Sequence, residues 1–113
     1  MFLTMLKAKL HRIPVTEANL AYEGSLTLDP DFMEAVGVLP YEKILCANVA
    51  NGKRFETYAI AGRRGSRVCC LNGAAAHMGA PGDLLIVMAF AGMSAEEASG
   101  FVPKVLHFGA AGA

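Results

Sequence analysis

Hydrophobic and polar residues alternate along the first dozen positions of the chain, a pattern typical of a half-buried β-strand. Successive side chains of a strand point to opposite faces, so residues of one parity share one environment. One parity here is apolar and the other is polar and partly cationic: Leu6, Ala8 and Leu10 on the first, Met5, Lys7, Lys9 and His11 on the second. We therefore predict a strand over residues 2–13 whose apolar face lies in the core.

Turn residues divide the rest of the chain into further short strands. The dipeptide Asn51-Gly52 is the strongest hairpin signal, and it joins two β-rich segments. A turn is predicted at residues 80–83, and a loop of small residues at 72–77. The predicted strands cover residues 25–28, 41–49, 53–61, 67–71, 84–90 and 104–108.

Capping residues indicate two short helices. The expected residue types stand at their ends: Asp29, Pro30 and Gly37 around the first, Ser94 and Glu97 in a capping box at the start of the second, over 94–99. Residues 16–21 are predicted to form one helical turn, and residues 109–113 a disordered tail. Many short strands, two or three short helices and no alternation of strand with helix predict a mainly β barrel. The length of 113 residues allows a single domain over residues 1–113.

Composition adds an expectation about assembly. Hydrophobic residues make up 54% of the chain and charged residues 18%, where about 25% charged is ordinary. A monomer of this composition would leave apolar surface uncovered, so we expect a homo-oligomer. Lys plus Arg and Asp plus Glu are balanced at 10 each and scattered. No basic face for nucleic acid or anionic membrane is therefore expected, and a small-molecule ligand is favoured.

Cysteine usage and hydropathy bear on location. Cys46, Cys69 and Cys70 are an odd number and imply no disulfide framework. The longest apolar run, residues 84–90, is far shorter than the roughly 20 residues of a membrane span. The first twelve residues lack a signal-peptide pattern. We expect a cytoplasmic protein with no membrane partner, and no metal, because the histidines and cysteines have no ligand-like spacing.

The dipeptide Gly24-Ser25 is the first candidate for chemistry. A serine hydroxyl lies within reach of the carbonyl before it, and the conformational freedom of Gly24 is expected to let a strained turn press the two together. Such a turn can be cleaved by its own serine. A Gly-Ser pair on its own is most often an ordinary turn, so other residues must support this interpretation.

Arg54 and Tyr58 have the same strand parity and can face one pocket. The guanidinium of Arg54 suits a carboxylate, and the phenol of Tyr58 can donate a proton. Thr57 has the opposite parity. A joint role for Thr57 therefore requires a bulge, or a site between strands or subunits.

Several short motifs, in this order and spacing, resemble the aspartate 1-decarboxylase family over residues 1–108. They are Lys9-Leu10-His11-Arg12, Tyr22-Glu23-Gly24-Ser25, Asn51-Gly52-Lys53-Arg54-Phe55 with Thr57-Tyr58-Ala59-Ile60, Arg64-Gly65-Ser66-Arg67, and Asn72-Gly73-Ala74-Ala75-Ala76-His77. The resemblance implies a double-psi β-barrel, a homotetramer with sites between subunits, and a proenzyme. Self-cleavage at 24/25 would divide it into chains 1–24 and 25–113.

The resemblance also implies the chemistry. Attack by Ser25 on Gly24, β-elimination and loss of ammonia leave a covalent pyruvoyl group at position 25. This group forms a Schiff base with L-aspartate and supports its decarboxylation to β-alanine and CO2, without pyridoxal phosphate or metal. The resemblance implies that Tyr58 donates a proton and that Thr57 supports the oxyanion during cleavage and contacts the substrate. It implies that Lys9 and Arg54 bind the carboxylates and that His11 and Tyr22 form pocket walls. Polar anchoring is implied for Asn72, and backbone N–H donation for Gly73, Ala74 and Ala75.

Three alternatives stay open at this stage. The chain can be a non-catalytic small β-barrel binding module, or a pyruvoyl decarboxylase of another amino acid such as glutamate. A third alternative is a proenzyme that needs a helper protein to mature. Ala47 departs from the bulkier residue of many relatives and is expected to alter the pocket shape.

Overall fold

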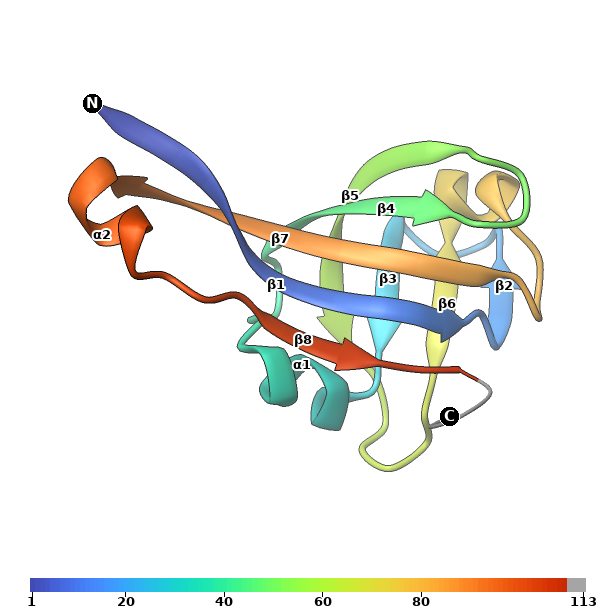
Figure 1. Ribbon diagram of the computed structural model, residues 1–113. Coiled ribbons are helices and arrows are strands. Elements are labelled where there is room, and N and C mark those ends of the chain that lie inside the picture. The colour runs from blue at the N-terminus through green and yellow to red at the C-terminus, as the bar shows by residue number, and fades with distance from the viewer. Residues whose placement is uncertain (110–113) are drawn as a thin grey trace.

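The computed structural model describes residues 1–109, most of them as strands of one mixed sheet (Figure 1). The strands are β1 (Phe2–Pro14), β2 (Glu17–Asn19), β3 (Ser25–Leu28), β4 (Lys43–Asn48), β5 (Arg54–Ala61), β6 (Cys69–Asn72), β7 (Leu84–Ser94) and β8 (Lys104–His107). The helices are α1 (Pro30–Val36), α2 (Ala95–Ser99) and the 3-10 helix η1 (Gly73–Met78). None of the helices within residues 1–109 is long and apolar enough to span a membrane.

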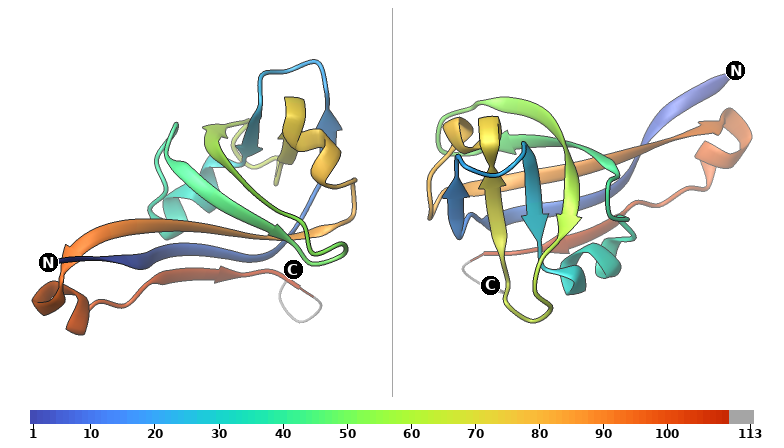
Figure 2. Two further views of the ribbon diagram at one scale, coloured as in Figure 1. Left: turned by 90° about the horizontal axis from the view of Figure 1, so that it is seen from above. Right: turned by 180° about the vertical axis from the view of Figure 1, so that it is seen from behind.

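The sheet has the order β2-β6-β3-β5-β4-β7-β1-β8. β1 with β8, β2 with β6 and β3 with β5 are parallel pairs, and the other neighbours are antiparallel. The strands β2, β6 and β3 run across the direction of β4, β7, β1 and β8 (Figure 2), and the curved strand β5 joins the two groups. This mainly β arrangement agrees with the double-psi β-barrel class, although no ladder joins β2 to β8 within the described part of the chain.

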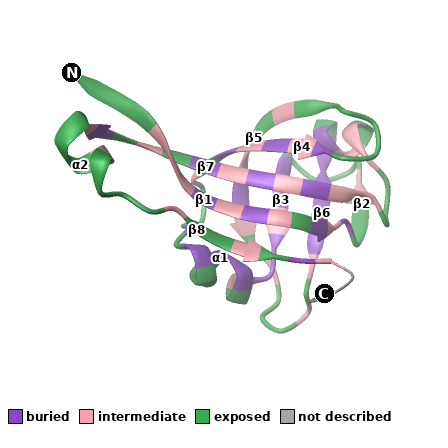
Figure 3. Cartoon of the chain, viewed as in Figure 1, coloured by how far each residue is buried: buried purple, intermediate pink, exposed green. Residues whose placement is uncertain are grey.

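The core lies between these two groups of strands. Alternate residues along β1, β4 and β7 are buried, which Figure 3 shows as bands of purple. Large aliphatic side chains with 0–1% exposure fill this space: Leu10, Leu26, Ile44, Leu71 and Leu85. The period of two in the sequence therefore identified the buried face of β1 correctly.

The predicted helix ends are confirmed. The Asp29 carboxylate accepts from the Asp31 N–H at 2.9 Å and caps α1, while Gly37 ends it in the left-handed region with φ +77°. Ser94 and Glu97 form the reciprocal capping box of α2. The hairpin at Asn51-Gly52 also forms, since β4 and β5 are antiparallel. These features depend on neighbouring residues alone, which is why sequence finds them.

Two segments differ from prediction. Residues 16–21 hold the short strand β2 in place of a helical turn, because pairing with β6 supplies the backbone hydrogen bonds that one isolated turn cannot keep. The predicted loop 72–77 is largely the helix η1. The tail prediction concerns mainly residues 110–113, which lie outside the described residues.

Several strand limits also move. β6 begins at Cys69 instead of residue 67, since Arg67 has φ +61°. β7 continues to Ser94 because it pairs with β1 as far as Phe2. The resulting β1–β7 ribbon extends beyond the rest of the sheet, with α2 at its end (Figure 1). The strand at 104–108 is confirmed as β8, but it pairs with β1 at the sheet edge and does not close the sheet within residues 1–109.

Candidate active site

The Gly24–Ser25 bond lies where the chain enters β3. The Ser25 side chain is buried, with 2% exposure. Its Oγ donates to the Glu23 carbonyl oxygen at 3.2 Å and accepts from Nδ2 of Asn72 at 3.0 Å. The hydroxyl is thus held against the chain that precedes it, on the side of the bond it is predicted to attack.

Asn72 faces Ser25 because the two residues are register partners in the antiparallel β3–β6 pair. The Asn72 side chain is fully buried, so its amide needs partners within the protein. Besides Ser25, it contacts Thr27 and Cys70. The sequence analysis missed Thr27 and Cys70. The available signal was parity, since Thr27 shares the parity of Ser25 along β3 and Cys70 shares that of Asn72 along β6.

The unusual backbone of the site belongs to Gly73 and not to Gly24. Gly24 is not among the glycines with positive φ, and a Cβ added to it would make only ordinary contacts of 3.9 and 4.0 Å. Gly73 has φ +61°, and a Cβ there would lie 2.6 Å from both the Gly24 nitrogen and the Tyr22 carbonyl oxygen. The expectation that Gly24 supplies the conformational freedom is therefore wrong. Glycine is needed at 73, where two backbone segments touch.

A pocket of about 260 Å³ opens beside Gly24. It is lined by Gly24, Phe55, Glu56, Thr57, Ala74, Ala75 and Met78. Thr57 has the parity of the core-facing residue Ala59, and it reaches this pocket because the parallel register Leu26–Ala59, continued two residues back, places Thr57 beside Gly24. Neither a bulge nor a second subunit is needed to bring Thr57 near Gly24.

Tyr58 lies on the side of the sheet opposite to Thr57. Leu26 pairs with Ala59, so Tyr58 lies one position earlier, alongside Ser25, on the side that faces away from the core. Its ring centroid is 6.3 Å from that of Tyr41. Tyr22, in contrast, has an exposed side chain and meets the site through its backbone carbonyl.

Lys9 and His11 lie on a different part of the sheet, whereas Arg54 lies on β5, the strand next to β3. Direct cross-strand partners point to the same side, and the registers run Arg54–Ala47–Ile86–His11 in one row and Glu56–Leu45–Met88–Lys9 in the next. We call these two rows, with Tyr58, the outward face. The strands β5, β4 and β7 separate β1 from β3 in the sheet. The structure therefore does not bring Lys9 or His11 next to Ser25 within one chain.

The cations of the outward face have no carboxylate partner among residues 1–109. Lys7 pairs with Glu42 at 2.5 Å, and Arg64 pairs with Asp31 and Glu34, but neither Lys9 nor Arg54 forms an ion pair there. Unpaired cations on a largely apolar sheet face are suited to binding anions.

The surroundings of His11 favour its neutral form. Its partial burial lowers its pKa, and the charges of Lys9, His107 and Arg12 lower it further. Its Nδ1 is buried without a hydrogen-bond partner in the described chain, and the His107 ring stands edge-on at 5.4 Å. His11 is thus a half-buried wall of the outward face.

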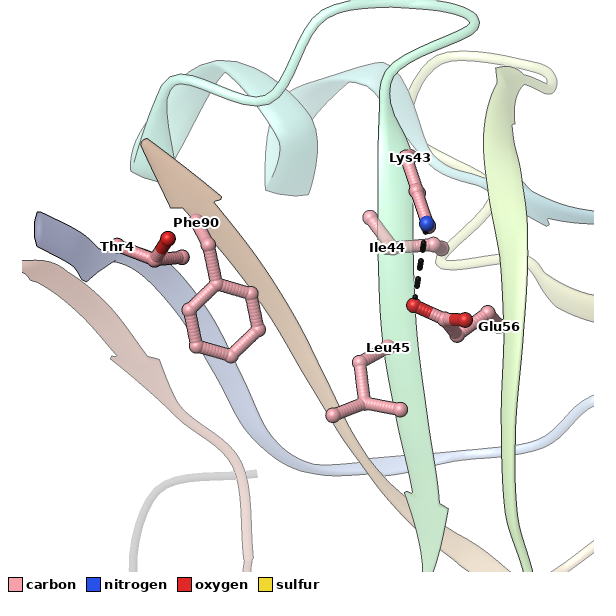
Figure 4. A pocket seen from close by; sticks show the side chains of 6 residues that line it. All are labelled: Thr4, Lys43, Ile44, Leu45, Glu56 and Phe90. Atoms are coloured by element: carbon pink, nitrogen blue, oxygen red, sulfur yellow. Dashed lines mark ion pairs between the residues drawn. The ribbon is translucent and has the colours of Figure 1, made fainter. Parts of the chain in front are cut away.

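A second pocket, of about 270 Å³, is one that sequence did not predict (Figure 4). It is lined by Thr4, Lys43, Ile44, Leu45, Glu56 and Phe90. The Lys43–Glu56 ion pair of 3.3 Å crosses one side of it, and the Phe90 ring lies on the other. It contains none of the predicted site residues and adds no nucleophile to the site.

The cysteines and histidines are not arranged as a metal centre. Within residues 1–109, no three His, Cys, Asp or Glu side chains are grouped closely enough to hold an ion. All three thiols are free and buried, and burial raises the pKa of Cys46 to about 12. Their thiols therefore stay protonated.

Comparison with known proteins identifies the family. The family model described as Aspartate decarboxylase matches residues 1–112. Proteins named Aspartate 1-decarboxylase are similar throughout. That of Salinibacter ruber is 54% identical over 95% of this chain and 73% of its own length. That of Pelotomaculum thermopropionicum is 57% identical over 94% of this chain and 80% of its own length. That of Syntrophobacter fumaroxidans is 59% identical over 90% of this chain and 82% of its own length. With a buried Ser25 after Gly24, an Asn72 donor to its hydroxyl and this similarity along nearly its whole length, the chain belongs to the aspartate decarboxylase family.

Proposed function

We propose that this chain cleaves its own Gly24–Ser25 bond, converts Ser25 into a pyruvoyl group and decarboxylates L-aspartate to β-alanine and CO2. The observation that carries the proposal is the buried Ser25 hydroxyl, held between the Asn72 amide and the Glu23 carbonyl beside Gly24. The relatives named Aspartate 1-decarboxylase support the choice of substrate. The free thiols support a reducing compartment, the cytoplasm.

Cleavage begins when Ser25 Oγ attacks the Gly24 carbonyl carbon. A C–O bond forms, the C–N bond breaks, and the acyl group moves from nitrogen to oxygen. The negative charge that develops on the Gly24 oxygen needs a donor, and the Thr57 hydroxyl lines the pocket beside Gly24. The Asn72 N–H supports the charge on Ser25 Oγ while its proton leaves. Gly73 allows the close approach of the 22–24 backbone.

A pyruvoyl group, once formed, supplies a carbonyl that takes up the substrate amine and withdraws electrons as CO2 leaves. Lys9 and Arg54 bind the two carboxylates, since both are free of ion pairs among the described residues. Tyr58 delivers a proton from its phenolic oxygen to the carbon that has lost CO2. Asn72 and the backbone N–H groups of residues 73–75 orient the reacting end, where the small side chains of Ala74 and Ala75 permit close contact. His11 and Tyr22 form walls of the substrate pocket.

The separation of Lys9 from Ser25 supports an assembly in which the outward face of one copy meets the Ser25 region of another. A closed homotetramer satisfies this requirement, with one site at each interface between neighbouring copies. The exposed apolar residues of the chain, such as Phe90 and Val105 at 41% and 38%, are consistent with burial between copies.

Intact mass of the purified, denatured protein tests the cleavage. We expect two chains, 1–24 and a longer one that is lighter by one ammonia than a serine-terminated peptide, and β-alanine from L-aspartate. Ser25→Ala should abolish both. A single uncut chain would contradict the proposal and favour a binding module. Cleavage that occurs only when cell extract is added would identify a maturation helper, and turnover of glutamate alone would change the substrate.

Mixing two inactive variants tests the shared site. Ser25→Ala and Lys9→Ala chains, co-expressed with different tags and purified through both, should regain part of the parent activity if residues from two subunits build one site. Each variant purified alone serves as the control. No recovery in a verified mixed oligomer would contradict the shared site but leave self-cleavage standing.

A further inference from the structure

Three buried side chains, Ser25, Cys70 and Asn72, form a compact polar cluster with the partly buried Thr27 behind the scissile bond. The antiparallel register pairs Ser25 with Asn72 and Thr27 with Cys70, so all four side chains point to the same side of the sheet. Cys70 is 4% exposed but is absent from the hydrophobic core cluster, which contains its neighbour Cys69. Thr27 and Cys70 have no assigned part in the chemistry described above.

Hydrogen bonds within this cluster fix the Asn72 amide at both ends. Its Nδ2 donates to Ser25 Oγ at 3.0 Å and to Thr27 Oγ1 at 2.7 Å. Its Oδ1 accepts from the Cys70 thiol at 3.1 Å. Burial, together with the charge of Glu17, raises the pKa of Cys70, so the thiol keeps the proton that it donates.

The direction of the amide matters for the nucleophile. Turned by half a rotation, the amide would aim its oxygen at Ser25, and the Ser25 hydroxyl would then lose the N–H that stabilises negative charge on Oγ. The turned amide would also direct its N–H groups at sulfur, which is a weak acceptor. The thiol donor therefore favours the orientation that serves Ser25, and the Thr27 hydroxyl accepts from the amide in that orientation and keeps it in place.

We propose that Cys70 and Thr27 are positioning residues for self-cleavage: they hold the Asn72 amide with its N–H on Ser25 Oγ and thereby set the rate at which the Gly24–Ser25 bond is cut. This inference rests on the proposed function. Donors that are already oriented toward a developing charge stabilise it without reorganisation, so loosening the amide slows the reaction.

The test is a cleavage time course of the full chain, made by cell-free synthesis and followed by intact mass. Cys70→Ala should slow cleavage about fivefold to tenfold, the effect of one lost hydrogen bond. Cys70→Ser keeps a donor and should stay within about twofold of the parent. Thr27→Val removes the acceptor at nearly constant shape and should slow cleavage, whereas Thr27→Ser should not.

Cys69→Ala is the matched control, because it removes the neighbouring thiol from the core without touching Asn72. Thermal unfolding of each variant in a Ser25→Ala background reports stability separately. We expect Cys69→Ala to lower the melting temperature more than Cys70→Ala and yet to cleave at the parent rate.

Two results would overturn the inference alone: cleavage of Cys70→Ala at the parent rate, or equal slowing by Cys70→Ser and Cys70→Ala. In both, the parent chain still cuts itself and the proposed function stands. A parent chain that stays uncut would overturn the proposed function and this inference together.

Discussion

The Ser25 region and the outward face of the sheet are built on opposite physical principles. Around Ser25, the side chains that contact Asn72 are neutral and buried or partly buried, and hydrogen bonds between β3 and β6 hold them in place. On the outward face, Lys9 and Arg54 are charged, partly or fully exposed, and without ion-pair partners among residues 1–109.

This difference separates two tasks. Breaking a backbone bond needs donors held at fixed positions, which a dry, packed cluster within one chain provides. Holding a dicarboxylate needs cations that stay available until the substrate arrives. Variants of the first region should therefore alter self-cleavage, and variants of the second should spare cleavage and alter turnover.

The largest effect on self-cleavage is expected at Gly73, in the Ser25 region. Gly73→Ala places a Cβ 2.6 Å from the Gly24 nitrogen and the Tyr22 carbonyl oxygen, so the 22–24 segment must shift and cleavage should be lost. Gly52→Ala is the control, since Gly52 also has positive φ but open space around it. It should cost only about 1 kcal/mol of the free energy of unfolding. Intact mass measures the cleavage. If the Gly73→Ala chain cut its Gly24–Ser25 bond at the parent rate, the role of this contact would be contradicted.

Tyr58 lies between the two regions, and its variant shows whether cleavage and turnover can be separated there. Tyr58→Phe keeps the ring but removes the proton, so the chain should cleave normally and kcat should fall about 10²- to 10⁴-fold. KM for L-aspartate should change little. Tyr41→Phe serves as the control because its ring packs near Tyr58 without lying alongside Ser25. Full activity of Tyr58→Phe would remove Tyr58 as the proton donor.

Arg54 tests the outward face by itself. Arg54→Gln should leave the rate of self-cleavage unchanged and lower kcat/KM for L-aspartate roughly 30-fold or more, as expected for a lost charge-assisted pair. Arg63→Gln removes an exposed cation from a loop instead and should have no effect on either measurement. Slowed cleavage in Arg54→Gln would mean that the two regions are not separable.

The smallest effect concerns pH. The folded pKa of His11 is lowered from 6.5, so the unfolded chain binds more protons than the folded chain as pH falls below 6.5. Stability contributed by neutral His11 is therefore present above pH 6.5 and declines as pH falls toward the folded pKa. In a Ser25→Ala background, His11→Gln should show a shallower decline in unfolding free energy over this interval. Identical slopes would assign the decline to other groups.

Local sequence patterns found much of the fold but only part of the site. Caps, the hairpin at Asn51-Gly52 and the buried parity of β1 depend on residues a few positions apart, and all were predicted. The strand β2 was missed because its stability comes from pairing with β6, about fifty residues away. The same limit concealed Cys70 and Thr27, whose importance comes only from sharing Asn72 with Ser25.

By itself, the sequence determined the alternation that buries one face of β1, the chemical types at the candidate site and the similarity that places the chain in its family. Tertiary structure decided how those residues meet. It placed the critical glycine contact at Gly73 instead of Gly24, brought Thr57 beside Gly24 through the β3–β5 register, and kept three strands between Lys9 and Ser25. The physical reason is that side-chain type and local propensity reside in single residues and their neighbours, whereas strand order and register arise from hydrogen bonds between distant segments.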